Sequence, residues 1–89
     1  MRQLEQTTQF KRDLKKIASS GRYKKEDLLA LIELLIQDQP LPVKNRDHAL
    51  INDWSSYREC HIKPDWLLIY KKHDDKLLLA RTGSHSELF

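Results

Sequence analysis

The chain has 89 residues, of which 39% are hydrophobic and 33% are charged, and this composition is typical of one small folded domain spanning residues 1–89. It excludes a disordered chain and a membrane-embedded one, because the longest strongly apolar run, Leu28 to Ile36, contains Glu33 and is too short to cross a bilayer. The first six residues lack the apolar centre of a secretory signal, and the single cysteine, Cys60, cannot form an internal disulfide. We therefore expect a cytoplasmic protein with no membrane partner.

The net charge of +3 hides an asymmetry along the chain. Residues 1–25 contain eight Lys or Arg against two acids, whereas the remaining residues contain eight basic and eleven acidic side chains. A basic block of this kind is typical of a protein that binds a phosphate-rich or acidic partner. A solvated helix face gives the same pattern, so charge alone leaves both interpretations open.

The first half of the chain predicts a short strand and two helices. Residues 2–7 are compatible with a strand, and Thr7 or Thr8 can cap a helix over residues 9–19 that ends near Gly21. One face of this helix is apolar and the opposite face is basic. The basic residues are Lys11, Arg12, Lys15 and Lys16.

A second helix is expected over residues 24–38. Acidic side chains occupy its first turn, where the helix dipole favours them, and two prolines follow its end. Its apolar face is broad, which suggests that it packs against both a sheet and the first helix. Residues 40–56 are rich in polar and turn-forming types and are expected to form a loop.

The last third of the chain changes to the periodicity of strands. The expected strands cover residues 57–63, 65–71 and 76–82. Residues 66–70 are apolar on both faces, as a central strand requires. The predicted fold class is therefore α+β, with a short N-terminal strand and a two-helix hairpin packed on one face of an antiparallel sheet.

Four polar residues lie near the ends of these strands, where antiparallel pairing can bring them together. They are His61, Asp65, Arg81 and His85. Histidine transfers protons near neutral pH, and an arginine beside it can hold a phosphate and offset charge that develops on a phosphorane. Base, acid and fixed cation are what metal-free RNA cleavage by the 2′-hydroxyl needs. DNA lacks that hydroxyl, so such a site would act on RNA only.

Each of these residues also has a purely structural interpretation. A lone histidine is usually a surface or hydrogen-bonded residue, Asp65 after Pro64 can simply shape a turn, and Arg81 can pair with a carboxylate. Trp54 and Trp66 fit the core or its rim at least as well as a base-stacking role. Cys60 alternates on the core side and is expected to be a buried thiol. The close, ordered spacing of a histidine metal site is absent, so we expect no metal.

Four segments of the second half closely resemble YafQ-type toxins of the RelE/ParE superfamily of toxin–antitoxin modules. They are Arg46-Asp-His-Ala-Leu50, Trp54-Ser-Ser-Tyr-Arg58, His61-Ile-Lys-Pro-Asp-Trp-Leu-Leu-Ile-Tyr70 and Arg81-Thr-Gly-Ser-His-Ser-Glu-Leu-Phe89. The resemblance covers essentially the whole chain, because the N-terminal strand and two helices also fit the family's layout. It implies a RelE-like fold that closes with a short C-terminal helical segment.

The resemblance implies a ribosome-dependent mRNA endonuclease that cuts the codon in the ribosomal A site and needs no metal or other cofactor. The implied partners are the ribosome, mRNA and a cognate antitoxin, and operator DNA is bound only through the antitoxin complex. Carried over by residue, the active positions are His48, His61, Asp65, Trp66, Arg81, His85 and Phe89. His85 would transfer protons with His61, His48 or Asp65, in an order that stays open. Arg81 would stabilise the phosphorane, and Trp66 and Phe89 would position or stack the nucleotide.

Two further expectations concern residues outside that set. Lys11, Arg12, Lys15 and Lys16 are candidates for contact with ribosomal RNA, an assignment that rests on helical facing and not on the family motif. Where family members often carry glycine, this chain carries Asn52, which is also tolerant of left-handed backbone. We therefore expect the turn before Trp54 to persist, with a loop shape around His48 that can differ.

Two other functions compete with the nuclease. A toxin of the same fold could act by binding gyrase, as the ParE branch does by resemblance, or the chain could be a non-catalytic module that binds RNA or an antitoxin. Gyrase-directed branches generally lack a histidine-rich C-terminal site, and this chain has one, which favours the nuclease. Codon preference does not follow from the sequence.

Overall fold

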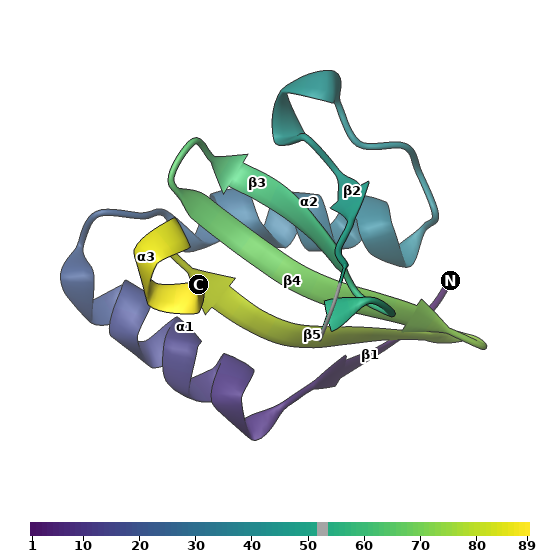
Figure 1. The fold of residues 1–89 in the computed structure, drawn as a ribbon, viewed down its shortest axis with the longest axis horizontal. Helices are drawn as coiled ribbons and strands as arrows, with labels where there is room; N and C mark the ends of the chain where they lie inside the picture. The colour runs from purple at the N-terminus through teal and green to yellow at the C-terminus, as the bar shows by residue number, and fades with distance from the viewer. Residues whose placement is uncertain (52–53) are drawn as a thin grey trace.

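The computed structural model describes residues 1–51 and 54–89. Its five strands form one sheet, and helices α1 and α2 lie beside and behind that sheet (Figure 1). The elements in chain order are β1 (Gln3–Gln6), α1 (Thr8–Ser20), α2 (Lys25–Ile36), η1 (Val43–Asn45), β2 (His48–Ala49), β3 (Arg58–Lys63), β4 (Trp66–His73), β5 (Lys76–Gly83) and α3 (His85–Leu88). The strand order is β1-β5-β4-β3-β2; β1 runs parallel to β5, and the other neighbours are antiparallel. The α+β class and the order of the main elements are confirmed.

Helix α1 begins and ends as the sequence predicts. The hydroxyl of Thr7 accepts a hydrogen bond from the backbone N–H of Phe10 at 2.9 Å, and Gly21 closes the helix in the left-handed conformation at φ 70°. The same hydroxyl donates to the carbonyl of Ala80 at 2.8 Å, so the cap also ties the start of α1 to β5. This tie fixes the helix beside the strand that carries Arg81.

The sheet separates two apolar clusters. On one side, the side chains of α1 and α2 pack with residues such as Leu68, Tyr70 and Leu77 of the central strands. On the other side, Leu88 of α3 and the segment around Trp54 cover a smaller cluster. The residues of this smaller cluster are Leu67, Ile69, Ala80 and Leu88, with Leu50, Trp54 and Tyr57 packed against them. Strand β4 has buried residues on both faces, which confirms its expected central place.

The segment expected to be a loop over residues 40–56 holds more structure than its composition predicts. It contains the single turn η1 and the two-residue strand β2, whose residues His48 and Ala49 pair with Glu59 and Arg58 of β3. A strand this short has no detectable periodicity of its own, because its partner supplies its hydrogen bonds. The expectation made for Asn52 lies outside the described residues.

Two smaller expectations can also be compared with the structure. Cys60 is buried, and this burial raises the pKa of its thiol, so it is an inert core residue as expected. Among the residues that the structure describes, no helix is long and apolar enough to cross a membrane.

Candidate active site

The register of the sheet places the polar candidates on the face that lies opposite to α1 and α2. His48 pairs with Glu59, Glu59 with Ile69, and Ile69 with Arg81, which makes one row across four strands. Directly paired residues project to the same face, and Ile69 belongs to the cluster on the α3 side. His61 lies two residues beyond Glu59, so it projects to this face as well. The sheet itself therefore gathers His48, His61 and Arg81.

A buried carboxylate connects the two histidines of this face. The Nε2 atoms of His48 and His61 lie 3.5 and 3.6 Å from the same Oε1 atom of Glu59, whose side chain is 8% exposed. The Nδ1 atom of His48 lies 2.7 Å from the carbonyl of Arg46, and that of His61 lies 3.2 Å from the carbonyl of Pro64. A carbonyl only accepts, so each Nδ1 carries a hydrogen, and Nε2 is left as the atom that can exchange a proton.

Glu59 is a residue that the sequence reasoning missed. It alternates with His61 on β3, so the pleat alone places the two side chains on one face. The missing information was the short strand β2, which brings His48 to the other side of the same carboxylate.

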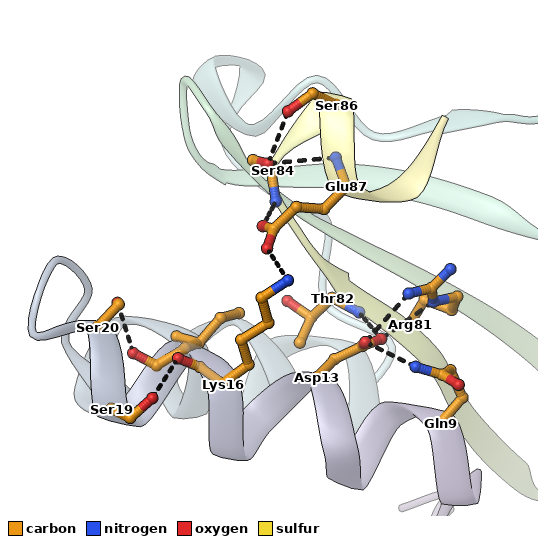
Figure 2. Close-up of polar contacts among 11 residues, drawn as sticks. Gln9, Asp13, Lys16, Ser19, Ser20, Arg81, Thr82, Ser84, Ser86 and Glu87 are labelled. Atoms are coloured by element: carbon orange, nitrogen blue, oxygen red, sulfur yellow. Dashed lines mark hydrogen bonds and ion pairs between the residues drawn. The ribbon is translucent and has the colours of Figure 1, made fainter.

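Two features of the fold, a β-bulge and an ion pair, orient the side chain of Arg81. The register between β4 and β5 shifts where Ile69 and Tyr70 face Arg81 and Leu79, so the extra residue of this bulge turns Arg81 to the face of Ile69. Its Nε and Nη2 atoms each donate to the carboxylate of Asp13 on α1 at 3.1 Å (Figure 2). These hydrogen bonds raise the pKa of Arg81, which keeps the guanidinium charged.

Asp13 is a second residue that the sequence reasoning missed. Its side chain is 8% exposed and accepts four hydrogen bonds, two from Arg81, one from Gln9 Nε2 at 3.0 Å and one from the backbone N–H of Thr82 at 3.2 Å. The structural interpretation of Arg81 predicted an ion pair with a carboxylate, and the structure contains that ion pair. Two of the five guanidinium N–H groups face Asp13, and Nη1 has no partner among the described residues.

His85 opens helix α3 and is exposed. Ser84 caps this helix with a capping box in which Glu87 accepts from the backbone N–H of Ser84 at 2.8 Å (Figure 2). Glu87 also pairs with Lys16 of α1 at 2.9 Å. The backbone hydrogen bond from Ser84 and the contact with Lys16 lower the pKa of Glu87 to about 2. Helix α1 therefore holds both Arg81 and the helix of His85.

Asp65 and Phe89 flank His85. The Oδ1 atom of Asp65 accepts from the backbone N–H of His85 at 3.3 Å, and the rings of His85 and Phe89 are 5.3 Å apart between centroids. Phe89 is 54% exposed and can offer a ring face to a ligand. The structure thus brings together Asp65 with His85, and His48 with His61. Among the described residues, no hydrogen bond or ion pair joins these two groups to each other.

The expectation that Trp66 stacks on a nucleotide is wrong in this structure. Its side chain has 0% exposed area, its ring stacks on Tyr23 at 4.7 Å, and its Nε1 donates to the hydroxyl of Thr82 at 2.9 Å. A ring enclosed in this way has no face left for a base. Trp66 is a core residue at the start of β4, in line with the alternative that sequence reasoning kept open.

The four basic residues of α1 line two different cavities. Arg12 and Lys16 line a cavity of about 220 Å³ together with Asp13 and Arg81, next to the candidate site. Lys11 and Lys15 line a separate groove of about 600 Å³ between the two long helices, whose lining also includes Tyr23 and Trp66. The helix therefore presents one basic pair toward Arg81 and a second pair elsewhere.

Comparison with known proteins decides the family. The model of a family described as the bacterial toxin of the type II toxin-antitoxin system, YafQ, matches residues 2–89. The chain belongs to the YafQ family. Its curated YafQ relatives include the mRNA interferase toxin YafQ of Escherichia coli strain B / BL21-DE3, which is 42% identical over 89 residues, 99% of this chain and 96% of the relative.

Solved structures of the YafQ family have the same fold. The E. coli DinJ–YafQ complex matches with a TM-score of 0.88 at 41% identity and covers 100% of this chain and 99% of that chain. A copper-bound mutant toxin from Helicobacter pylori matches with a TM-score of 0.95 at 43% identity, with 100% of both chains covered. These likenesses confirm the expected RelE-like fold. Within residues 1–51 and 54–89 of the present chain, no group of three or more His, Cys, Asp or Glu is placed to hold a metal ion.

Proposed function

We propose that this YafQ-family toxin is an mRNA interferase, an endoribonuclease that cuts mRNA in the ribosomal A site without a metal. Its family is that of type II toxin–antitoxin toxins, and curated relatives at 40–42% identity are named mRNA interferases. The observation that carries the proposal is the sheet face to which His48, His61 and Arg81 project and on which α3, the helix of His85, packs through Leu88. Cleavage by the 2′-hydroxyl requires a general base, a general acid and a cation that stabilises the phosphorane, and imidazoles and a charged arginine can fill these roles.

In the proposed reaction, the groups that transfer protons and stabilise charge are side chains of this chain, and the nucleophile is the 2′-hydroxyl of the mRNA. A base removes the proton of the 2′-hydroxyl as its oxygen attacks the adjacent phosphorus, and an acid gives a proton to the departing 5′-oxygen. The products are a 2′,3′-cyclic phosphate and a free 5′-hydroxyl. We assign the proton transfers to His85 together with the Nε2 atom of His61 or His48. Arg81 stabilises the phosphorane through the donors that Asp13 leaves unused, and Phe89 positions the nucleotide.

Asp65 receives a supporting role in this proposal. Its carboxylate accepts the backbone N–H of His85, and its carbonyl accepts the hydroxyl of Tyr23 at 3.1 Å. An anion in this place holds the first turn of α3 and leaves proton transfer to the imidazoles.

The proposed partners follow from the family and its complexes. The E. coli relative forms a toxin–antitoxin complex with DinJ, so we propose that a cognate antitoxin protein binds and silences this chain. The ribosome, its RNA and mRNA are the other proposed partners, which implies action in the cytoplasm. Operator DNA is bound only through the antitoxin complex.

Cleavage by purified protein tests the proposal. The chain is added to mRNA with and without ribosomes that carry an empty A site, with EDTA in parallel samples. We expect cuts only with ribosomes, unchanged by EDTA. His85→Ala should slow single-turnover cleavage by roughly 10²–10⁴-fold, which is the usual size of a general acid–base contribution.

The matched control is His73→Ala. His73 lies at the end of β4, 3.6 Å from Glu5, and outside the candidate site. Equal cleavage by both variants would remove His85 from the chemistry. Absence of cleavage by folded wild-type protein would favour a toxin that binds its target, with gyrase as the next target to test.

A further inference from the structure

A second basic cavity lies directly beside His61. It has a volume of about 350 Å³ and is formed by the end of β3 and the segment of η1, with no acidic residue in its lining. Three cationic residues line it, Lys44, Arg46 and Lys63. His61 belongs both to this lining and to the face that carries Arg81, so the cavity adjoins the candidate site at His61.

The charge of this cavity is largely uncompensated. Among residues 1–51 and 54–89, no carboxylate lies within 4 Å of the side-chain nitrogens of Lys44 or Arg46. Lys63 has one partner, Asp27, at 3.5 Å on the surface. The neighbouring acid, Asp47, instead accepts from Arg58 at 3.2 Å and from the hydroxyl of Tyr70. A cavity with unpaired cations and no acid favours an anion.

The segment that carries these cations is fixed to both histidines of the site. The buried side chain of Asn45 donates to the carbonyl of His61 at 2.6 Å, and the carbonyl of Arg46 accepts from Nδ1 of His48 at 2.7 Å. Arg46 itself adopts the left-handed conformation at φ 47°, which is costly for a residue other than glycine. The backbone around Lys44 and Arg46 is therefore held in place before any ligand arrives.

We propose that this cavity binds a backbone phosphate of the mRNA next to the phosphate that is cut. The inference rests on the proposed function and names the path of its substrate, from Arg81 and His85 across His61 to Lys44 and Arg46. A phosphodiester of ribosomal RNA has the same chemistry. The mRNA is favoured because the cavity shares His61 with the catalytic face, so an occupant of one lies beside an occupant of the other.

The test combines a change in the protein with a change in the mRNA. A set of mRNAs carries one neutral methylphosphonate each, in place of successive phosphates on either side of the cut. We expect wild-type cleavage to fall roughly tenfold or more for one of these flanking positions, as lost hydrogen bonds to a charged group imply. Lys44→Ala/Arg46→Ala should cut the unmodified mRNA roughly 10- to 100-fold more slowly in kcat/KM and should be insensitive to that same position.

Lys72→Ala/Lys76→Ala is the matched control, since it removes the same charge from the β4–β5 hairpin, where neither residue lines the cavity or the candidate site. It should behave as wild type does. Unchanged cleavage by the Lys44 and Arg46 variant overturns the inference, and so does a loss that is equal for every methylphosphonate position, because that pattern places the contact on ribosomal RNA. If the wild-type protein cuts no mRNA at all, the proposed function is wrong, and the inference that rests on it is wrong as well.

Discussion

Asp13 and Arg81 form the most closely defined pair of side chains in the candidate site. A bidentate pair between a guanidinium and a carboxylate fixes the plane of the guanidinium as well as its position. The same carboxylate also offsets part of the positive charge that Arg81 brings to a phosphate. Asp13 therefore affects catalysis in two opposing ways, through orientation and through charge, and a substitution can show which is larger.

We expect orientation to dominate, so Asp13→Asn should lower single-turnover cleavage about tenfold, since a hydrogen bond to a charged group contributes about 1.5–3 kcal/mol. Ribosome affinity should not change, because Asp13 is buried. Gln9→Ala is the control, since Gln9 donates to the same carboxylate at 3.0 Å and, among the described residues, has no hydrogen bond to Arg81. A faster Asp13→Asn protein would mean that charge compensation outweighs orientation.

Individual residues also show where sequence reasoning stops. The sequence predicts that Arg81 can pair with an acid but does not indicate Asp13, because the pair joins positions 68 residues apart and depends on how α1 docks on β5. The stacking role expected for Trp66 fails for a similar reason. Its motif is visible in the sequence, but its enclosure by Tyr23 and Thr82 is a property of the packed core.

Helix α3 is an element that depends on its surroundings. Four residues are far too few for a stable isolated helix, so its position rests on the capping box, on the buried side chain of Leu88 and on the ion pair between Glu87 and Lys16. Gly83 allows the close approach, because a Cβ atom there would lie 3.3 Å from Oε1 of Glu87. The placement of His85 therefore depends on Glu87 as well as on Asp65.

Because the pKa of Glu87 is lowered, the position of α3 should depend on pH within a defined range. The hydrogen bonds from Ser84 and the contact with Lys16 lower the pKa from 4.5 to about 2. A carboxyl whose pKa is lower in the folded state stabilises that state fully above pH 4.5, and this contribution is lost as the pH falls toward 2. We expect NMR signals of His85 and Phe89 to shift over this range as α3 loosens.

The indole N–H signal of Trp66 reports on the core in the same titration, because it bonds to Thr82 in the buried interior. It should keep its position while the signals of α3 move. Glu87→Gln retains an oxygen for the capping box but has no carboxyl to titrate, so its α3 signals should not shift between pH 4.5 and 2. Identical titrations of the two proteins would assign the transition to another group.

The elements differ in how far the sequence predicts them. Helices α1 and α2 and strands β3, β4 and β5 are predictable because periodicity and caps are local signals. Strand β2 is not, since its two residues are defined only by β3, and the parallel pairing of β1 with β5 joins the two ends of the chain. The candidate site is partly predictable. Its histidines can be picked out in the sequence, but the row of paired residues that brings His48 to Glu59 depends on β2.

On the scale of the whole molecule, the orientation of α1 distributes its four basic side chains between two different cavities. One side of the helix contributes Arg12 and Lys16 to the cavity of Arg81, and another side contributes Lys11 and Lys15 to the groove beside α2. The proposed contact with ribosomal RNA concerns all four residues. The two pairs need not contribute equally, since only Arg12 and Lys16 lie next to Arg81, which is proposed to contact the cut phosphate.

Ribosome binding as a function of salt tests this division. Removing all four basic residues should weaken binding and flatten the dependence of log affinity on log salt, since each phosphate contact contributes roughly 0.7–0.9 to that slope. Arg12→Ala should account for a slope change of about one, whereas Lys11→Ala/Lys15→Ala should change it less. Arg12 is substituted without Lys16 because loss of Lys16 would also release Glu87 and move α3. A slope that stays the same in the fourfold variant would place the ribosomal contact on another face, and a larger change for Lys11 and Lys15 would assign the groove between the helices to RNA.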